Sequence, residues 1–394
     1  MTSTDRWQLP DGIEEVLPGQ AARVEQLRRD LLDLFCSWGY ELVIPPLVEF
    51  TESLLVGLGA DLDLLTFKMT DQLSGRSLGV RADITPQVAR IDAHSLGSDA
   101  VTRLCYAGST LHTRPKTPMA SRSPIQLGAE LYGDGSLAAD AEVIGLMLAT
   151  LGAAGVCKAD KTLTLDLGHV GVYEAVLKAA ELDDATEEQV FDALQRKSKP
   201  DLEEILERVS PDSAEMILAL LELHGDDTVL ARAREAFADV APAAVTAIGA
   251  LEQIAAIIRN QHNDIGIYFD LAELRGYHYH TGIVFAAYVD GHGQALANGG
   301  RYDNVGEVFG RARPATGFAT DLKAVVRLLT QDEQAQPGAI SAPAVDDAEL
   351  IRAVAALRAQ GEVVINMLGS EADPRCDRRL VAENTQWVVK PIND

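Results

Sequence analysis

Hydrophobic and polar positions along the chain follow two different periods, and these predict both helices and strands. From Val24 to Phe35, apolar residues recur every three or four positions, as they do on one face of an α-helix. Gly39 follows at the place where a helix often ends in a left-handed glycine. We therefore expect a helix that ends close to residue 39.

Strand patterns follow this helix. Residues 39–50 predict a strand, which two prolines confine to a sheet edge or an interface. Residues 64–90 predict two strands joined by a Ser-Gly turn and then a helix that begins near Thr85 and Pro86. Residues 102–132 have the outline of a hairpin with a long, proline-rich tip. Two further elements predicted before residue 169 are a helix at 140–155 and a strand at 162–168.

The pattern then changes to helix throughout residues 170–261, which are rich in Ala, Leu and Glu. Strand patterns resume in residues 262–330. We interpret 170–261 as a helical insertion between two parts of one core, formed by 1–169 and 262–330. The predicted fold is α+β, with an antiparallel-rich sheet and flanking helices.

A small C-terminal domain is predicted after this core. Residues 331–345 have the composition of a linker. Residues 346–394 are too few to bury a large core of their own. They predict an α/β domain with a helix at 346–359, a strand at 363–368, a helix at 374–383 and a strand at 387–392.

Composition narrows the possible partners. The 394-residue chain carries a net charge of −25 at pH 7. Because proteins that bind nucleic acid neutralise phosphates with Lys and Arg, this charge argues against nucleic acid as a partner. The four cysteines are too widely spaced for a clustered metal or redox motif. We found no signal-peptide pattern and no segment approaching a membrane span in apolar length, so we expect no membrane association and a cytoplasmic location.

Several polar residues on predicted strands and tight turns could line a pocket for a small molecule. Gln126 and Glu130 are an even number of residues apart on one predicted strand, so both side chains point to the same face. Carboxylates can bind an ammonium group and arginine can bind a carboxylate, which favours an amino acid as the ligand. Taken singly, each residue is better explained as an ordinary surface or turn residue. The other candidates are Asp83, Thr85, Arg275 and Tyr302.

His278 and His280 point to one side of a predicted strand, and paired histidines can bind metal. No third ligand lies nearby in the sequence, so we predict no metal site. The chain also has no glycine-rich nucleotide loop and no serine nucleophile elbow. We therefore predict no cofactor.

Taken together, the segments from residue 9 to about 329 resemble, in order, the catalytic core of histidyl-tRNA synthetase, a class II aminoacyl-tRNA synthetase. The resemblance implies a class II synthetase-like antiparallel sheet. GYELVIPPLVEF (39–50) resembles motif 1, with Pro46 at the motif's proline, which implies a dimer interface. The other matching segments are YAGSTLHTRPKTPMASRSPIQLGAELYG (106–133) for motif 2, LRGYHYHTGIVF (274–285) for a histidine-specific signature and PATGFATDLKAV (314–325) for motif 3.

The departures from the synthetase pattern concern ATP. His112 stands where motif 2 has the arginine for the α-phosphate, and Arg114 stands where it has a glutamate for adenine. Ala324 replaces the arginine of motif 3. Neutral histidine and alanine cannot supply the permanent charge and paired bonds that arginine gives a phosphate. Since adenylate formation depends on that stabilisation, we predict no catalytic residues. The C-terminal domain is also much shorter than the synthetase's anticodon-binding domain.

This combination is that of the regulatory subunits of ATP phosphoribosyltransferase, to which RADITPQVAR (81–90) is very similar. The resemblance implies a non-catalytic chain that the short-form catalytic subunit needs for the first step of histidine biosynthesis. It also implies a hetero-octamer of four catalytic and four regulatory chains, self-association as a dimer, and histidine as the feedback effector.

By the same resemblance, the amino-acid pocket would hold histidine. Tyr279 and His280 stand where the synthetase has two adjacent tyrosines, the second of which contacts the imidazole. The implied roles are Asp83 and Thr85 for the α-amino group, Gln126 and Glu130 for the amino group and imidazole, Arg275 for the carboxylate, and Tyr302 for the pocket wall.

Two other functions remain open at this point. One is a synthetase-like paralogue with a different amino-acid-sensing or amino-acid-transfer role. The other is an active histidyl-tRNA synthetase, against which the missing arginines and the short C-terminal domain argue.

Overall fold

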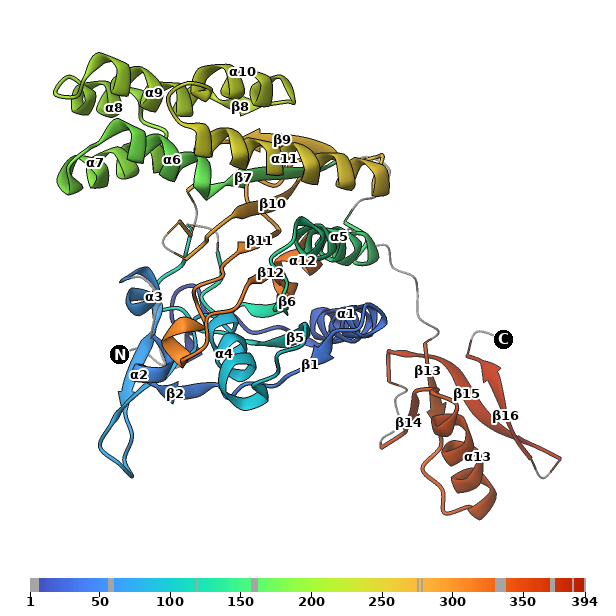
Figure 1. Ribbon diagram of the computed structural model, residues 1–394. Coiled ribbons are helices and arrows are strands. Elements are labelled where there is room, and N and C mark those ends of the chain that lie inside the picture. Colours follow the sequence, from blue (N-terminus) through green and yellow to red (C-terminus); the bar gives the residue numbers. More distant parts are fainter. Residues whose placement is uncertain are drawn as a thin grey trace. The chain divides into compact units, whose positions relative to one another are not determined.

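The computed structural model describes residues 7–55, 60–117, 120–156, 162–274, 276–277, 279–329, 338–368, 373–384 and 386–392. The chain divides into two compact units, Met1–Leu329 and Thr330–Asp394, and each is considered by itself (Figure 1).

A nine-stranded sheet is the scaffold of the first unit within the described residues, in the order β1-β5-β6-β12-β11-β10-β7-β9-β8. Neighbouring strands are antiparallel except at the pairs β1–β5 and β7–β9. The strands are β1 (Glu41–Leu42), β5 (Thr102–Ser109), β6 (Ile125–Tyr132), β7 (Leu163–His169), β8 (His224–Gly225), β9 (Gly266–Asp270), β10 (Ile283–Val289), β11 (Ala297–Arg301) and β12 (Ala315–Asp321).

Helices cover one face of this sheet and bury the large core against it (Figure 1). The helices that contribute to this core include α1 (Pro18–Ser37), α5 (Leu137–Ala153), α6 (Val170–Ala180), α11 (Pro242–Gln261) and α12 (Leu322–Leu328). Alternate residues of β6, β7 and β10 enter this core, as the period of two predicts. On the opposite face, a second, smaller cluster packs around Ile84, Tyr106 and Tyr302.

Several local predictions are confirmed. The first helix ends at Ser37, and Gly39 has the expected positive φ of 84°. The predicted hairpin is β5 and β6, paired in register from Thr102–Tyr132 to Ser109–Ile125. The predicted helix at Thr85 is α4 (Thr85–Arg90), which a π-helical turn (Ile91–Leu96) continues.

The strand predicted over residues 39–50 is divided between two sheets. β1 joins the main sheet, whereas β2 (Val48–Phe50) joins a small sheet of order β2-β4-β3 with β3 (Phe67–Thr70) and β4 (Ser77–Val80). Pro45 and Pro46 lie between the two strands, and because proline lacks an N–H it interrupts a ladder. The remaining short elements of the first unit are α2 (Thr51–Leu54), α3 (Ala60–Leu65) and a 3₁₀ turn (Glu307–Phe309).

Helices fill residues 170–261 as predicted, apart from the short strand β8. They do not form a separate body, because α6 and α11 share the large core with the sheet. The helices between them are α7 (Asp184–Gln195), α8 (Lys199–Leu206), α9 (Pro211–Glu222) and α10 (Thr228–Phe237).

The expectation that no segment approaches a membrane span in apolar length is corrected. By length and composition, α11 is apolar enough to cross a membrane, and it is the one such helix among the described residues. Its apolar residues, including Ile248, Leu251 and Ile258, are buried in the large core. That is the position of a core helix in a folded domain.

The second unit has a four-stranded sheet of order β14-β13-β15-β16 within the described residues. The predicted helix is α13 (Ala348–Ala359), and the predicted end strands are β14 (Val364–Asn366) and β16 (Gln386–Pro391). Two predictions here were wrong. β13 (Ala339–Ala342) occupies part of the predicted linker, and the predicted helix at 374–383 is the strand β15 (Cys376–Glu383).

The cause of the second error is tertiary pairing. β15 lies between β13 and β16 and bonds to both, and inward-facing Leu380 joins the small core of this unit. These pairings outweigh the weak helical tendency of a charged segment.

Candidate functional site

The candidate pocket residues lie on the open face of the main sheet. β6 directs Leu127, Ala129 and Leu131 into the large core. Because side chains alternate along a strand, Gln126 and Glu130 project from the other face. The register therefore places both residues on the face that the parity of their numbers predicts.

Glu130 is the centre of a buried hydrogen-bond network. It is 1% exposed and accepts hydrogen bonds from the hydroxyls of Tyr302 and Tyr106, the latter at 3.0 Å. The Tyr106 hydroxyl also lies 3.0 Å from Thr85 Oγ1. Burial raises the pKa of Glu130 to about 8, although these hydrogen bonds act to lower it. At neutral pH most of this carboxyl is therefore protonated.

Two glycines in the sheet make room for this network. Gly317 of β12 pairs directly with Glu130, and a methyl group there would overlap the carboxylate. Gly128 pairs with Tyr106, and a methyl group there would overlap the tyrosine hydroxyl. The floor of the site is thus formed by backbone, which allows polar groups to lie close against the sheet.

A second part of the network holds the loop before α4. Asp83 Oδ1 accepts hydrogen bonds from the backbone N–H of Thr85 and from Gln126 Nε2, both at 2.9 Å. In return, Gln126 Oε1 accepts a hydrogen bond from the N–H of Ile84 at 3.0 Å. The loop before α4 and the strand β6 are therefore joined by hydrogen bonds of Asp83 and Gln126, two of the predicted ligand-binding residues.

Aromatic rings close one side of the site. The ring centroids of Tyr279 and Tyr302 are 4.9 Å apart, and Tyr132 meets Tyr302 edge-on at 6.3 Å. The Tyr279 hydroxyl is buried and has no hydrogen-bond partner within the described part of the chain. Such an unpaired buried hydroxyl is costly unless something binds it.

The loop that carries Tyr279 is anchored on the helical insertion. The ring of Tyr277 lies 4.9 Å from that of Tyr173 in α6 and 5.4 Å from that of Phe191 in α7. This loop therefore contacts the helical insertion through Tyr277 and the candidate site through Tyr279.

The remaining two candidates are His280 and Arg275. His280 packs against Gly300 and lies 5.5 Å from the ring of Tyr279. Arg275 lies outside the described residues, as does His278. His280 lines a small cavity of about 30 Å³ whose other polar residues are Asp166, Glu273 and Asn298.

Sequence reasoning missed Tyr106 and Tyr132 as site residues. Both lie on the face of Glu130, because Tyr106 pairs with Gly128 and Tyr132 shares the parity of Glu130 on β6. The parity of β6 alone would have identified Tyr132, whereas Tyr106 requires the hairpin register, which is known only once the two strands are paired.

The residues at the places of the synthetase's ATP-binding groups differ from one another in their surroundings. His112 is 3% exposed, and its Nε2 lies 2.9 Å from the carbonyl oxygen of Ala82. Burial lowers its pKa, so the imidazole is neutral at pH 7. Arg114 is exposed, and Ala324 follows Lys323, whose buried ammonium lies 3.2 Å from Glu14.

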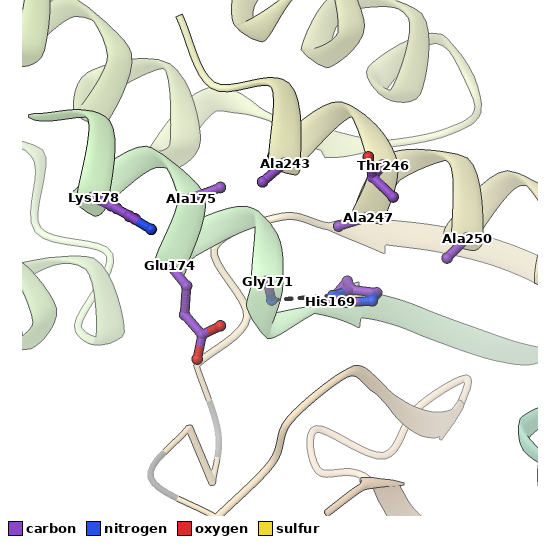
Figure 2. A pocket seen from close by; sticks show the side chains of 9 residues that line it. All are labelled: His169, Gly171, Glu174, Ala175, Lys178, Ala243, Thr246, Ala247 and Ala250. Carbon is purple, nitrogen blue, oxygen red and sulfur yellow. Dashed lines mark hydrogen bonds between the residues drawn. The ribbon is translucent and has the colours of Figure 1, made fainter. Parts of the chain in front are cut away.

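A larger groove lies between α6 and α11 (Figure 2). Its volume is about 370 Å³, and its walls are mostly glycine and alanine. His169 Nδ1 accepts a hydrogen bond from the backbone N–H of Gly171 at 3.0 Å, and burial lowers the pKa of the His169 imidazole to about 4. The polar side chains here form no network like that around Glu130. We therefore take the open face of the sheet as the candidate functional site.

Comparison with sequence families divides the chain at the boundary of its two units. The family "Histidyl-tRNA synthetase" matches residues 12–325. The family "ATP phosphoribosyltransferase subunit HisZ C-terminal domain" matches residues 337–390. Within the described residues, the first match covers the nine-stranded sheet with its helices, and the second covers the four-stranded sheet.

Full-length relatives are similar along the whole chain. The ATP phosphoribosyltransferase regulatory subunit of Stutzerimonas stutzeri is 52% identical over 398 residues, which is 100% of both chains. The protein of the same name from Thioalkalivibrio sulfidiphilus is 53% identical over 399 residues, again 100% of both.

Solved structures support the fold. An ATP phosphoribosyltransferase regulatory subunit/histidyl-tRNA synthetase from Bacillus halodurans is 27% identical and matches with a TM-score of 0.83 over 95% of this chain and 96% of that one. Histidyl-tRNA synthetase from Nostoc sp. is 18% identical, with a TM-score of 0.76 over 95% and 91% of the two chains. The predicted α+β fold of the class II synthetase type is confirmed.

Proposed function

This chain belongs to the family of ATP phosphoribosyltransferase regulatory subunits, and we propose that it binds histidine on the open face of its sheet and thereby controls the catalytic subunit. The family places the chain in histidine biosynthesis. The proposal adds the effector, its site and the residues that hold it.

The network around Glu130 is the observation that carries this proposal. A carboxyl that is almost fully buried, held by two tyrosine hydroxyls and kept partly neutral by burial is costly for folding alone. Such a carboxyl can serve to bind a ligand with several N–H groups, because these groups can donate to Glu130 in place of the tyrosine hydroxyls. The imidazole and ammonium groups of histidine provide N–H donors for both Glu130 and Asp83.

We propose the following contacts. The ammonium group lies against Asp83 and the Thr85 hydroxyl, where Gln126 already bonds to Asp83. The imidazole donates to Glu130 from the side closed by Tyr279 and Tyr302. The roles of Arg275 at the carboxylate and of His280 near the imidazole follow from the resemblance to the synthetase.

Histidine binding to Glu130 would be linked to protons. A positive or N–H-bearing ligand favours the ionised carboxylate and therefore lowers the raised pKa of Glu130. We expect proton release on binding at neutral pH, and tighter binding as the pH rises from 6 toward 8.

The chain acts in this proposal as a non-catalytic subunit. Buried, neutral His112 and the small side chain of Ala324 leave no arginine at the two positions that would stabilise a nucleotide's phosphates. Catalysis then belongs to the short-form ATP phosphoribosyltransferase subunit. We propose a hetero-octamer of four catalytic and four regulatory chains in the cytoplasm.

Self-association is proposed at the free edge of the main sheet. β1 is the outermost strand at that end. The apolar residues beside it are exposed, with Leu42 at 49%, Ile44 at 85% and Leu47 at 50%. An unprotected apolar sheet edge is a surface that a second copy can cover.

The test is phosphoribosyl-ATP formation by a short-form catalytic subunit, with and without this chain and then with added histidine. We expect activation by the chain and its reversal by histidine. A Glu130→Ala variant should still activate but should lose sensitivity to histidine. Failure to activate a competent catalytic subunit would contradict the regulatory role, and ATP-dependent pyrophosphate exchange by this chain alone would contradict the non-catalytic one.

A further inference from the structure

The segment from residue 43 to 47 follows the edge strand β1 and accepts three hydrogen bonds from residues next to the candidate site. Pro45 and Pro46 have no backbone N–H, so this segment cannot complete a strand ladder. Pro45 is the buried residue of this segment, so its carbonyl oxygen in particular needs a donor.

Arg81 and Gln87 supply these donors. The Arg81 guanidinium donates from Nη1 to the carbonyl oxygen of Pro45 at 2.8 Å, and the Arg81 backbone N–H donates to that of Leu47 at 3.0 Å. Gln87 Nε2 donates to the carbonyl oxygen of Pro46 at 2.8 Å. Three successive carbonyl groups of the segment are therefore bound by two residues.

The position of Arg81 is closely defined. It is 7% exposed and forms no ion pair in the described part of the chain. Its Nε donates to the carbonyl oxygen of Ser109, at the end of β5, at 2.9 Å. A methyl group at Gly108 would overlap Arg81 Nη2. A buried cation with only backbone acceptors is costly, whereas its planar fork fixes the distance between the acceptors that it joins.

The same two residues bracket the candidate site. Asp83 and Thr85 lie between Arg81 and Gln87 in the sequence, and Thr85 begins the helix α4 that carries Gln87. Asp83 accepts hydrogen bonds from Thr85 and Gln126. Both hydrogen bonds go to Oδ1 of Asp83. An ammonium group that binds the same carboxylate draws on its negative charge and changes these two bonds, and with them the loop to which Arg81 and Gln87 are attached.

We propose that Arg81 and Gln87 are positioning residues that couple occupancy of the amino-acid site to the arrangement of segment 43–47 at the free sheet edge. This inference rests on the proposed function, because histidine binding at Asp83 is the event that changes the loop. The coupling requires histidine to bind two arrangements of the loop with different affinity, and it acts equally in both directions.

Hydrogen–deuterium exchange of the full-length protein tests the coupling, with calorimetry of histidine binding on the same samples. In the wild type, histidine should change the exchange rate of the peptide covering residues 41–50 by about fivefold or more, the usual lower range of coupling between sites. In Gln87→Met, which keeps the side-chain volume but removes the donor, histidine should still bind and the change should fall below about twofold.

Gln253→Met is the matched control. Gln253 is an exposed residue of α11 that donates to the carbonyl oxygen of Gly249 at 3.2 Å, and its loss should leave the wild-type response unchanged. If Gln87→Met fails to fold, Arg81→Lys replaces it, because lysine keeps the charge but cannot bond both Pro45 and Ser109 through one rigid fork.

The possible failures are distinguishable. Histidine that binds without altering exchange at residues 41–50, or an equal response in the wild type and the folded variant, overturns the coupling and leaves the proposed function intact. No heat of histidine binding to the wild type overturns the proposed function and the coupling with it.

Discussion

The substitution Glu130→Gln tests the electrostatics on which the candidate site depends. Glu130 is 1% exposed and its pKa is raised to about 8, primarily by burial. Glutamine keeps the shape of the side chain but has one acceptor oxygen, whereas Tyr106 donates to Oε1 and Tyr302 to Oε2 of Glu130. Its amide oxygen accepts from one tyrosine, its NH₂ group donates to the hydroxyl oxygen of the other, and no ionisation remains, so the folded structure should be retained.

The sign of the expected effect follows from linkage. In the unfolded chain, Glu130 ionises near its ordinary pKa of 4.5, whereas in the folded protein it ionises only near 8. The unfolded state therefore binds fewer protons between these pH values, and stability falls as the pH rises through this window. At 1.36 kcal/mol per pKa unit, Glu130 should lower the free energy of unfolding by about 4 kcal/mol between pH 4.5 and pH 8.

The variant should lose this part of the pH dependence. At pH 4.5 we expect wild type and Glu130→Gln to differ by about 1 kcal/mol or less, because the native carboxyl is neutral there. At pH 8 the variant should be more stable by about 4 kcal/mol. Below pH 4.5 the two curves should run in parallel.

Urea unfolding followed by circular dichroism at several pH values measures this difference, at one fixed protein concentration because the proposed self-association would contribute to stability. Glu215→Gln, in an exposed position of α9, is the matched control and should follow the wild type at every pH. Parallel curves for wild type and Glu130→Gln from pH 4.5 to 8 would refute the reasoning, since they would show that Glu130 titrates alike in both states.

Three further predictions follow from the same geometry. Glu130→Ala should raise the histidine concentration for half-maximal inhibition at least about tenfold, because it removes one good hydrogen bond to a charged group. Assembly with the catalytic subunit, measured by sedimentation, should be intact. Unchanged inhibition would rule out the assignment of Glu130 to the histidine site. Gly317→Ala should destabilise the protein by about 1–3 kcal/mol through overlap with Glu130 and should abolish histidine binding in calorimetry. Gly152→Ala in α5, which meets nothing within 4 Å, should be neutral or stabilising, and equal effects of the two substitutions would contradict the fit around Glu130. His112→Arg, alone or with Ala324→Arg, should lower the melting temperature, because His112 is buried and a larger side chain would overpack its site. Pyrophosphate exchange should remain absent. A gain of exchange would show that the nucleotide pocket is otherwise complete.

Much of the fold was predictable because local rules and tertiary structure agree in the core. The helix that ends at Ser37, the β5–β6 hairpin and the helix at Thr85 each follow from apolar periodicity and from the positions of Gly and Pro. In these segments the buried face coincides with the face that the periodicity indicates.

The errors lie where pairing partners decide the outcome. Residues 376–383 form a strand because β13 and β16 flank them, and 339–342 form a strand in the predicted linker for the same reason. Residues 39–50 divide between two sheets at the two prolines. Strand formation depends on partners that are distant in the sequence, so a local pattern gives only weak evidence for it.

The sequence by itself determined which residue types could form the site and, through the parity of Gln126 and Glu130, that two of them share a face. The tertiary structure alone decided that Tyr106 and Tyr302 reach Glu130, that Gly317 lies beneath it, and that burial brings its pKa to about 8. Parity is a local property of one strand, whereas register, burial and pKa arise from segments that the fold brings together from residues 83 to 317.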